Sequence, residues 1–171
     1  AAMLVEFMGL NPQLEIHLTS TNRRVDLVAE GIDIAIRART PPLEDSSLVM
    51  RELAQRDWYL VASPSLCQRH PLPVVPADLA RLPSLGDSVS DRGDHHWHLI
   101  GPDGATATIT HRPRLVTDDM HSLCAAAVAA LAAMQLPLMI MAGELRSDRL
   151  VRLLPQWCST GAVVHAVFPS R

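Results

Sequence analysis

The sequence is poor in cysteine, which excludes the small disulfide-rich folds. Its 171 residues include three cysteines, Cys67, Cys124 and Cys158, which lie far apart and form no Cys-x-x-Cys pattern. An odd number of isolated cysteines indicates neither a disulfide framework nor a zinc ribbon. We therefore expect a protein of the reducing cytoplasm, in which Cys67 and Cys124 are buried, inert thiols of predicted helices.

An excess of positive charge is also lacking. The chain has 15 Lys+Arg and 18 Asp+Glu, which gives a formal net charge of -3. Such a chain has no basic field to attract phosphate backbones. We do not expect it to bind nucleic acid by itself.

No segment is typical of export or of a membrane span. The opening residues, AAMLVEF, lack the charged region and the apolar run of a signal peptide. No apolar run reaches the roughly 18 residues that a spanning helix needs. The nearest candidate, residues 125–142, is interrupted by Gln135 and Pro137 and predicts a core helix followed by a buried strand. We expect no membrane association.

Common catalytic motifs are absent as well. The sequence has no Gly-x-Ser-x-Gly elbow, no Cys/His signature and no glycine-rich phosphate loop. We therefore expect neither an enzyme nor a bound cofactor.

What the chain does have is apolar residues at regular spacings. Apolar residues make up 48% of it, enough for the core of one domain or of two small lobes. Periods of 3.6 and of two residues mark helices and strands respectively. In the first third they predict a helix ending near residue 10, a strand over 14–18, a helix from Thr21 or Asn22 to Gly31, and a strand over 32–36. These last three form a βαβ unit.

The remaining residues predict more strands and a second βαβ unit. The expected elements are strands over 47–55 and 58–63, a short helix over 65–70, a stiff proline-rich connector over 71–83 with a helical turn near 78–80, a hairpin of 96–100 with 105–110, a strand over 115–117, a helix from Asp118 or Asp119 to Ala133, and a strand over 136–141.

The repeated unit predicts an α/β protein of two lobes. The first lobe is expected over 1–63, with 168–171 returning to it, and the second over 64–167. In each, a strand meets a capped helix N-terminus at its carboxyl end, and in open α/β sheets small ligands bind in that crevice. The two lobes would form a clamshell around a small molecule.

Several stretches resemble the effector-binding domain of LysR-type transcriptional regulators. They occur in family order and cover nearly the whole chain: NRRVDLVAEGIDIAIRA, DSSLVMREL, WYLVASPSL, RPRLVTDDMHSLCAAAVAAL, SDRLVRLLPQW and VHAVFPSR. The resemblance implies a two-lobed fold like the type 2 periplasmic binding proteins. It also implies a sensor in which a small-molecule effector controls transcription.

The same resemblance implies partners and a truncation at both ends. Binding to DNA would occur only through an N-terminal winged helix-turn-helix that this sequence does not contain. The first family strand and the final family helix are expected to be missing too. Family members form dimers through this domain, so a homodimer or higher homo-oligomer is expected in the full-length protein.

Five effector-binding residues are implied by the resemblance and a sixth by its position. Thr21 and Asn22 match the turn of the first lobe, and Thr117, Asp118 and Met120 match that of the second. Arg37 ends a predicted strand and would either bind a carboxylate effector or lie on the surface. By the residues alone, helix capping also explains Thr21, Asn22, Asp118 and Asp119.

Two further features allow more than one interpretation. His95, His96 and His98 suggest a metal site, but only His96 and His98 share a strand face, so a solvated strand end is preferred and no metal is expected. Ala130 and Ala132 stand where the family usually has glycines, which leaves the turn after the long helix unexplained.

Two other functions share this fold. A free-standing solute-binding receptor of the periplasmic type would carry a signal peptide in its gene, whereas a regulator would carry a helix-turn-helix. An enzyme on the same scaffold would lose turnover when His121 is changed.

Overall fold

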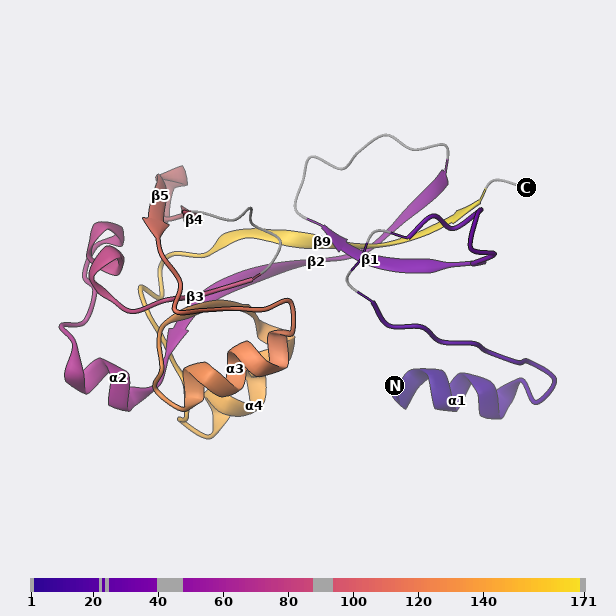
Figure 1. The fold of residues 1–171 in the computed structure, drawn as a ribbon, viewed down its shortest axis with the longest axis horizontal. Coiled ribbons are helices and arrows are strands. Elements are labelled where there is room, and N and C mark those ends of the chain that lie inside the picture. Colours follow the sequence, from indigo (N-terminus) through magenta and orange to yellow (C-terminus); the bar gives the residue numbers. More distant parts are fainter. Residues whose placement is uncertain (1, 22, 24, 40–47, 88–93, 170–171) are drawn as a thin grey trace.

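The structure, a computed structural model, describes residues 2–21, 23, 25–39, 48–87 and 94–169. Two long strands, β2 and β9, lie side by side along the molecule (Figure 1). The other short strands and α2, α3 and α4 gather at one end, whereas β1 and α1 lie toward the other (Figure 1). The elements are α1 (Ala2–Leu10), β1 (Ala35–Arg39), β2 (Leu48–Ala62), α2 (Pro64–Arg69), the 3-10 turn η1 (Pro76–Arg81), β3 (Leu85–Gly86), β4 (His95–Ile100), η2 (Pro102–Gly104), β5 (Thr106–His111), β6 (Leu115–Val116), α3 (Met120–Val128), β7 (Met134–Pro137), α4 (Leu138–Arg146), β8 (Val151–Arg152) and β9 (Ser159–Pro169).

The main sheet is antiparallel, with strand order β1-β9-β2-β7 and with β8 paired to β2. Sequence analysis divided β2 into two strands, over 47–55 and 58–63, and this division is wrong. A single strand runs through, and the irregularities appear as register shifts between Glu52 and Ala54 and between Arg56 and Trp58. A bulge takes up an extra residue without ending the strand, so the break in pattern at Arg56-Asp57 marks a bend.

The predicted hairpin is confirmed. Strands β4 and β5 pair antiparallel from His95↔His111 to Ile100↔Thr106. The turn uses a positive φ at Asp103 and at Gly104, as its Gly-Pro-Asp-Gly sequence favours. Burial alternates strictly along β4, which places every second side chain on the core.

The second predicted βαβ unit is present, with shorter elements than expected. Strand β6 leads through α3 to β7, and β3 lies between the two strands: it pairs parallel with β6 and makes a parallel bridge, Ser84↔Ala133, at the start of β7. The helix was expected to continue to Ala133 but ends at Val128. The following strand was expected over 136–141, yet α4 begins at Leu138. Pro137 is the last residue of β7 and the N-cap of α4, and it has no N–H to donate to a further ladder bond.

A Schellman motif ends α3 early. Leu131 donates its N–H to the carbonyl of Ala126 (3.0 Å), and Ala130 donates to that of Ala127 (3.0 Å). The motif needs a left-handed residue, and Ala130 has φ 60°. The Arg69 guanidinium of α2 also donates to the Ala130 carbonyl at 2.7 Å. The alanine thus adopts a conformation that glycine adopts without strain.

Replacing Ala130 by Gly is therefore expected to raise the free energy of unfolding by about 1 kcal/mol, since it removes the left-handed strain of an L-residue. Urea denaturation followed by circular dichroism measures the change. Ala129→Gly is the matched control, because Ala129 has φ −72° and gains nothing from glycine. Equal effects of the two substitutions would contradict the assignment of strain to Ala130.

The first predicted βαβ unit is largely not formed. Residues 14–18 form no strand, and Leu18 is 76% exposed. A strand needs a hydrogen-bonding neighbour, and β1 pairs with β9 instead. The strand expected over 32–36 is shifted to Ala35–Arg39.

The helix expected from Thr21 or Asn22 is a single turn that starts later. Asp26 accepts hydrogen bonds from the N–H groups of Val28 and Ala29, both at 3.1 Å, and so caps the turn itself. The turn closes at Gly31, whose φ of 65° agrees with its predicted place at the C-terminal end. An internal cap at Asp26 replaces the one that was expected at Thr21.

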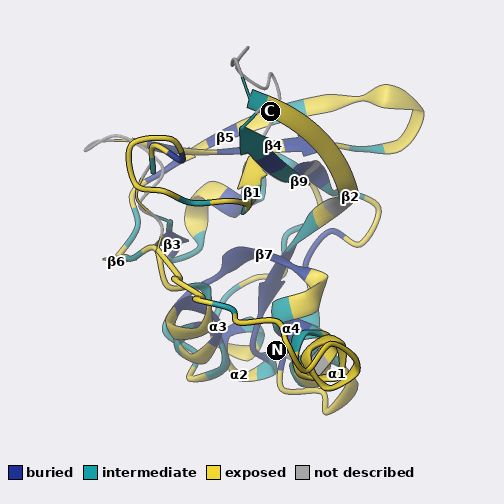
Figure 2. Ribbon diagram, turned by 90° about the vertical axis from the view of Figure 1, so that its right-hand side faces the viewer, coloured by how far each residue is buried: buried dark blue, intermediate teal, exposed yellow. Residues whose placement is uncertain are grey.

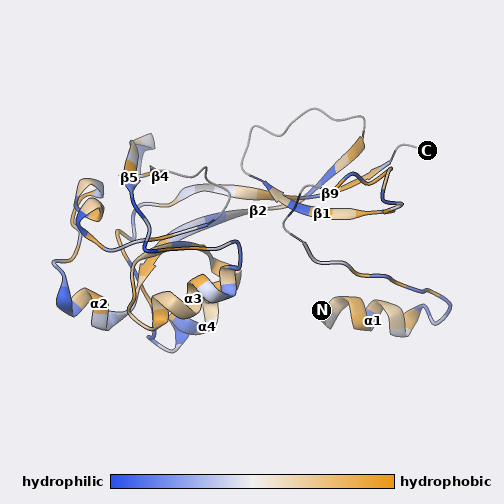
Figure 3. Ribbon diagram, in the orientation of Figure 1, coloured by the Kyte–Doolittle hydropathy of each residue, from blue (hydrophilic) through white to orange (hydrophobic). Residues whose placement is uncertain are grey.

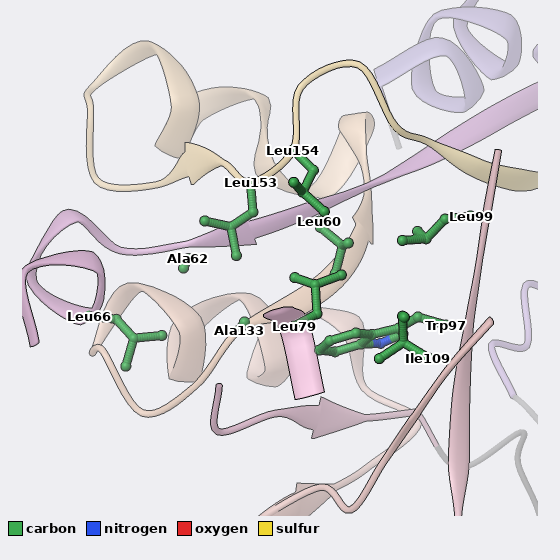
Figure 4. Packing of buried hydrophobic residues seen from close by; sticks show 10 residues of the cluster. All are labelled: Leu60, Ala62, Leu66, Leu79, Trp97, Leu99, Ile109, Ala133, Leu153 and Leu154. Atoms are coloured by element: carbon green, nitrogen blue, oxygen red, sulfur yellow. The ribbon is translucent and has the colours of Figure 1, made fainter. Parts of the chain in front are cut away.

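Two apolar clusters pack on opposite faces of β2 and β7. The hairpin-side cluster contains Leu60, Ala62, Leu66, Leu79, Trp97, Leu99, Ile109, Ala133, Leu153 and Leu154 (Figure 4). The helix-side cluster contains Val61, Leu85, Leu123, Cys124, Ala127, Ala132, Met134, Leu136, Met141 and Leu150. Both lie in the part of the chain after β2 begins, where Figure 2 shows most of the buried residues. By contrast, α1 is apolar (Figure 3) and exposed (Figure 2).

Candidate functional site

The carboxyl ends of β3 and β6 meet at one edge of the second half of the chain. The two strands are parallel, with Leu85 opposite Leu115 and Gly86 opposite Val116. Thr117, just after β6, donates its N–H to the carbonyl of Gly86 at 3.2 Å. The chain then turns directly into α3. This is the strand-to-helix crevice in which α/β proteins bind small ligands.

Asp119 caps α3, as one of the two predicted candidates. Its carboxylate accepts hydrogen bonds from the N–H of His121 (3.0 Å) and the hydroxyl of Ser122 (2.5 Å). These bonds, that from Ser122 above all, lower the pKa of Asp119 below its ordinary value. The negative charge of Asp119 therefore stabilises the N-terminus of α3. Its carboxylate also occupies an N–H group to which an anionic ligand could otherwise bind.

The three predicted residues of this turn differ in their surroundings. The Thr117 hydroxyl accepts a hydrogen bond from the Asp119 N–H at 3.2 Å and retains its own proton for another partner. Asp118 is exposed. Met120 is half-buried and packs against the helix-side cluster. The turn therefore offers a hydroxyl, a carboxylate and a thioether at one place.

The predicted residues of the first half lie elsewhere. Thr21 is exposed, and its hydroxyl accepts a hydrogen bond from the N–H of Arg23 (3.3 Å). Asn22 lies outside the described residues. Arg37 is half-buried and donates to the carbonyl of Val25 at 2.7 Å. Within the described part of the chain, no hydrogen bond joins Thr21 or Arg37 to the turn at Thr117.

Sequence analysis missed β3, whose end forms half of this edge. The strand has only two residues, too few for a period to show. Gly86 is the signal that was available: a Cβ on it would lie 2.7 Å from ring atoms of His95 and 2.8 Å from Pro113. Only glycine permits this close approach.

The histidines of the hairpin fall on two faces, as predicted. His96 and His98 are exposed, and their rings bond across the hairpin to Thr110 and Thr108, both at 3.1 Å. The expectation of a solvated strand end is wrong for His95, which is only 5% exposed. Strand alternation puts it on the core beside Trp97. Among the described residues, no group of three or more His, Cys, Asp or Glu is placed to hold a metal ion.

His111 faces His95 inside the core. Their ring centroids are 5.7 Å apart, and the Trp97 ring stacks on His111 at 4.0 Å. The Nδ1 atom of His111 lies 2.8 Å from the Ser84 hydroxyl. Burial, assisted by the neighbouring His95 and His96, lowers the pKa of His111 to about 4. A neutral imidazole is thus built into the core.

The prediction of buried thiols in helices is confirmed for Cys124, whereas Cys67 is only half-buried. Cys67 lies in α2 and Cys124 in α3, and burial raises the pKa of both thiols. A raised pKa disfavours the thiolate, which is the reactive form.

Two surface hollows lined by described residues lie away from the predicted effector residues. One of about 880 Å³ is lined mostly by apolar residues, including Leu27, Ile32, Val49 and Phe168. Another, of about 460 Å³, is polar and includes Ser84, Asp94, His111 and Arg112.

Comparisons with known proteins agree on one family. The model of the LysR substrate binding domain matches residues 1–171. The transcriptional activator AaeR of Escherichia coli K12 is 32% identical over all of this chain and 53% of its own length. The regulator PtxR of Pseudomonas aeruginosa is 28% identical over 96% of this chain and 51% of its own.

Solved structures show the same fold. The regulatory domain of AphB from Vibrio vulnificus superposes with a TM-score of 0.82 at 26% identity, covering 98% of this chain and 82% of that domain. The LysR-type regulator CrgA from Neisseria meningitidis gives a TM-score of 0.81 at 20% identity, over 99% of this chain and 56% of that one.

The chain belongs to the LysR substrate-binding domain family and has the two-lobed fold of LysR regulatory domains, which resembles the type 2 periplasmic binding proteins. It spans about half the length of the curated relatives that it matches. Those relatives are transcriptional regulators, not free-standing solute receptors. No helix among the described residues is long and apolar enough to span a membrane.

Proposed function

We propose that this domain senses a small-molecule effector bound between its two lobes, at the edge where β3 and β6 end. The lobes are residues 1–63, joined by 168–171, and residues 64–167. Thr117, Asp118 and Met120 contact the effector from the second lobe, and Thr21, Asn22 and Arg37 from the first. The observation that carries the proposal is the pair of parallel strands ending together at the capped N-terminus of α3.

Sensing follows from differential affinity. An effector that binds the closed arrangement of the lobes more tightly than the open one shifts the population toward the closed state. In the complete regulator, a cytoplasmic homodimer or higher homo-oligomer, this shift would move helix-turn-helix domains that bind DNA. The domain acts without catalysis. The names of the relatives, which are transcriptional regulators, support this proposal.

A thermal-shift screen tests the proposal. The chain is heated with acetate, succinate, benzoate or each standard amino acid, and a ligand that binds only the folded state raises the midpoint. A saturating effector at about 100 times its Kd adds about 2.7 kcal/mol. The rise should disappear in a Thr21→Val, Thr117→Val double variant.

Thr106→Val provides the matched control, because Thr106 is an exposed threonine of β5, outside the predicted site. A folded wild-type chain that responds to no ligand contradicts the proposal. Catalytic turnover of a bound ligand that is lost in His121→Ala would instead favour an enzyme.

A further inference from the structure

Gln135 is a buried polar residue between two apolar residues of β7, Met134 and Leu136. It lies in β7, opposite Leu60 of β2, and only 8% of it is exposed. Within the described residues, its Nε2 atom is buried and has no hydrogen-bond partner. Buried polar groups are almost always hydrogen-bonded, so an unpaired one calls for an explanation.

The direction of the side chain follows from its neighbours. Met134 and Leu136, on either side of it, belong to the helix-side cluster, so Gln135 points to the opposite, hairpin face. Leu60 and Ala133 share that face and are seen in Figure 4, with Trp97 and Leu99 of the hairpin beside them. An amide here sits in surroundings that would suit leucine.

The strand order places Gln135 at the ligand edge. Ser84 bridges Ala133 in parallel, and Leu85 donates its N–H to the Ala133 carbonyl at 2.9 Å. Gly86 lies two residues after Ser84, and Gln135 lies two residues after Ala133. Because residues two apart in a strand share a face, both face the hairpin. The ring of His95 covers Gly86, where a Cβ would lie 2.7 Å from it. Gln135 within β7, Gly86 at the end of β3 and Thr117 just after β6 thus lie at one level across three neighbouring strands.

We propose that Gln135 is an effector contact, whose Nε2 group donates a hydrogen bond to a carboxylate oxygen of the small molecule bound at this edge. The donor requires an acceptor, and a carboxylate offers two oxygens with several lone pairs. The inference rests on the proposed function and extends it to a residue that no motif indicated. It also explains why a polar group is kept where an apolar one would pack better.

The test compares Gln135→Met with wild type. Methionine conserves volume and removes the unpaired amide, so the ligand-free variant should melt about 2–4 °C higher. Its affinity for whichever carboxylate of the screen, amino acids included, raises the wild-type midpoint should fall about tenfold, the loss expected for one hydrogen bond. In NMR titrations of wild type, that carboxylate should shift the Gln135 side-chain amide signals, which are identified by their absence from the variant.

Gln68→Met is the control, since Gln68 is an exposed glutamine of α2. A wild-type response that Gln135→Met retains in full overturns this inference alone. A lower ligand-free midpoint also overturns it, because the amide would then support the fold. A wild-type response to no member of the screen overturns the proposed function, and this inference with it.

Discussion

Replacing Leu123 by Ala is expected to lower the free energy of unfolding by about 2–5 kcal/mol. Leu123 lies in α3 with 0% exposure and packs in the helix-side cluster with Val61, Leu136 and Met141. Truncating the Leu123 side chain removes buried apolar surface and leaves a cavity. The cavity remains because α3 cannot move closer to the sheet without disturbing its other contacts. Urea denaturation gives the change from the shift in midpoint at constant slope.

Met139→Ala is the control for Leu123. Met139 is 72% exposed in α4, so its truncation should change the free energy of unfolding by no more than about 0.5 kcal/mol. Similar losses at the two positions would show that α3 does not pack as described.

Lowering the pH from 6.5 to 4 is expected to destabilise the domain through His111. The unfolded chain binds a proton at this residue near pH 6.5, whereas the folded chain does so only at about 4. The stabilisation is therefore complete above pH 6.5 and is lost as the pH falls through this window. The full difference would correspond to about 3 kcal/mol, and solvent screening of this partly shielded ring reduces the expected loss to about 1–2 kcal/mol.

The comparison that isolates His111 is the dependence of stability on pH in His111→Phe. Phenylalanine keeps a ring against Trp97 and cannot be protonated, so the slope between pH 6.5 and 4 should flatten. His98→Phe, at an exposed position of the same hairpin, should keep the wild-type slope. The charges of His95 and His96 both lower the pKa of His111, so the titration of each histidine ring should be followed by NMR alongside the unfolding measurements. Identical slopes in all three proteins would contradict a buried neutral His111.

Local signals gave correct predictions where neighbours in the sequence are also neighbours in space. The Gly101-Pro102-Asp103-Gly104 turn contains its own positive-φ residues, so the hairpin around it was predictable. The cap at Asp119 likewise acts within two and three residues of itself. The turn at Thr117 was therefore predictable from the sequence too.

Predictions failed where a choice depended on contacts distant in sequence. The apolar residues from Leu138 to Met141 suit a strand or a helix, and the packing of Met141 into the helix-side cluster selects the helix. The alternating pattern of residues 14–18 predicts a strand, but β1 is hydrogen-bonded to β9 and provides no pairing to those residues.

The residues of the candidate site also fall into those that local sequence predicts and those that depend on distant contacts. Thr117, Asp118 and Met120 came from a local turn together with a family resemblance. Gln135 had no local signal, since an isolated glutamine in an apolar run is interpreted as an interruption. Strand β3 had none besides Gly86, because a two-residue strand has no period. Their significance depends on the parallel bridge between β3 and β7.

The sequence by itself determined the family, the α/β class, the hairpin and the capped start of α3, because these depend on residue types and on spacings of a few residues. Tertiary structure alone decided that β2 runs unbroken and that a strained Ala130 follows the end of α3 at Val128. It also decided that the buried Nε2 of Gln135, level with the end of β3, has no hydrogen-bond partner among the described residues. These features depend on which strand lies beside which. Hydrogen bonds and packing between residues far apart in the sequence, such as the paired Leu48 and Pro169 of β2 and β9, decide that order.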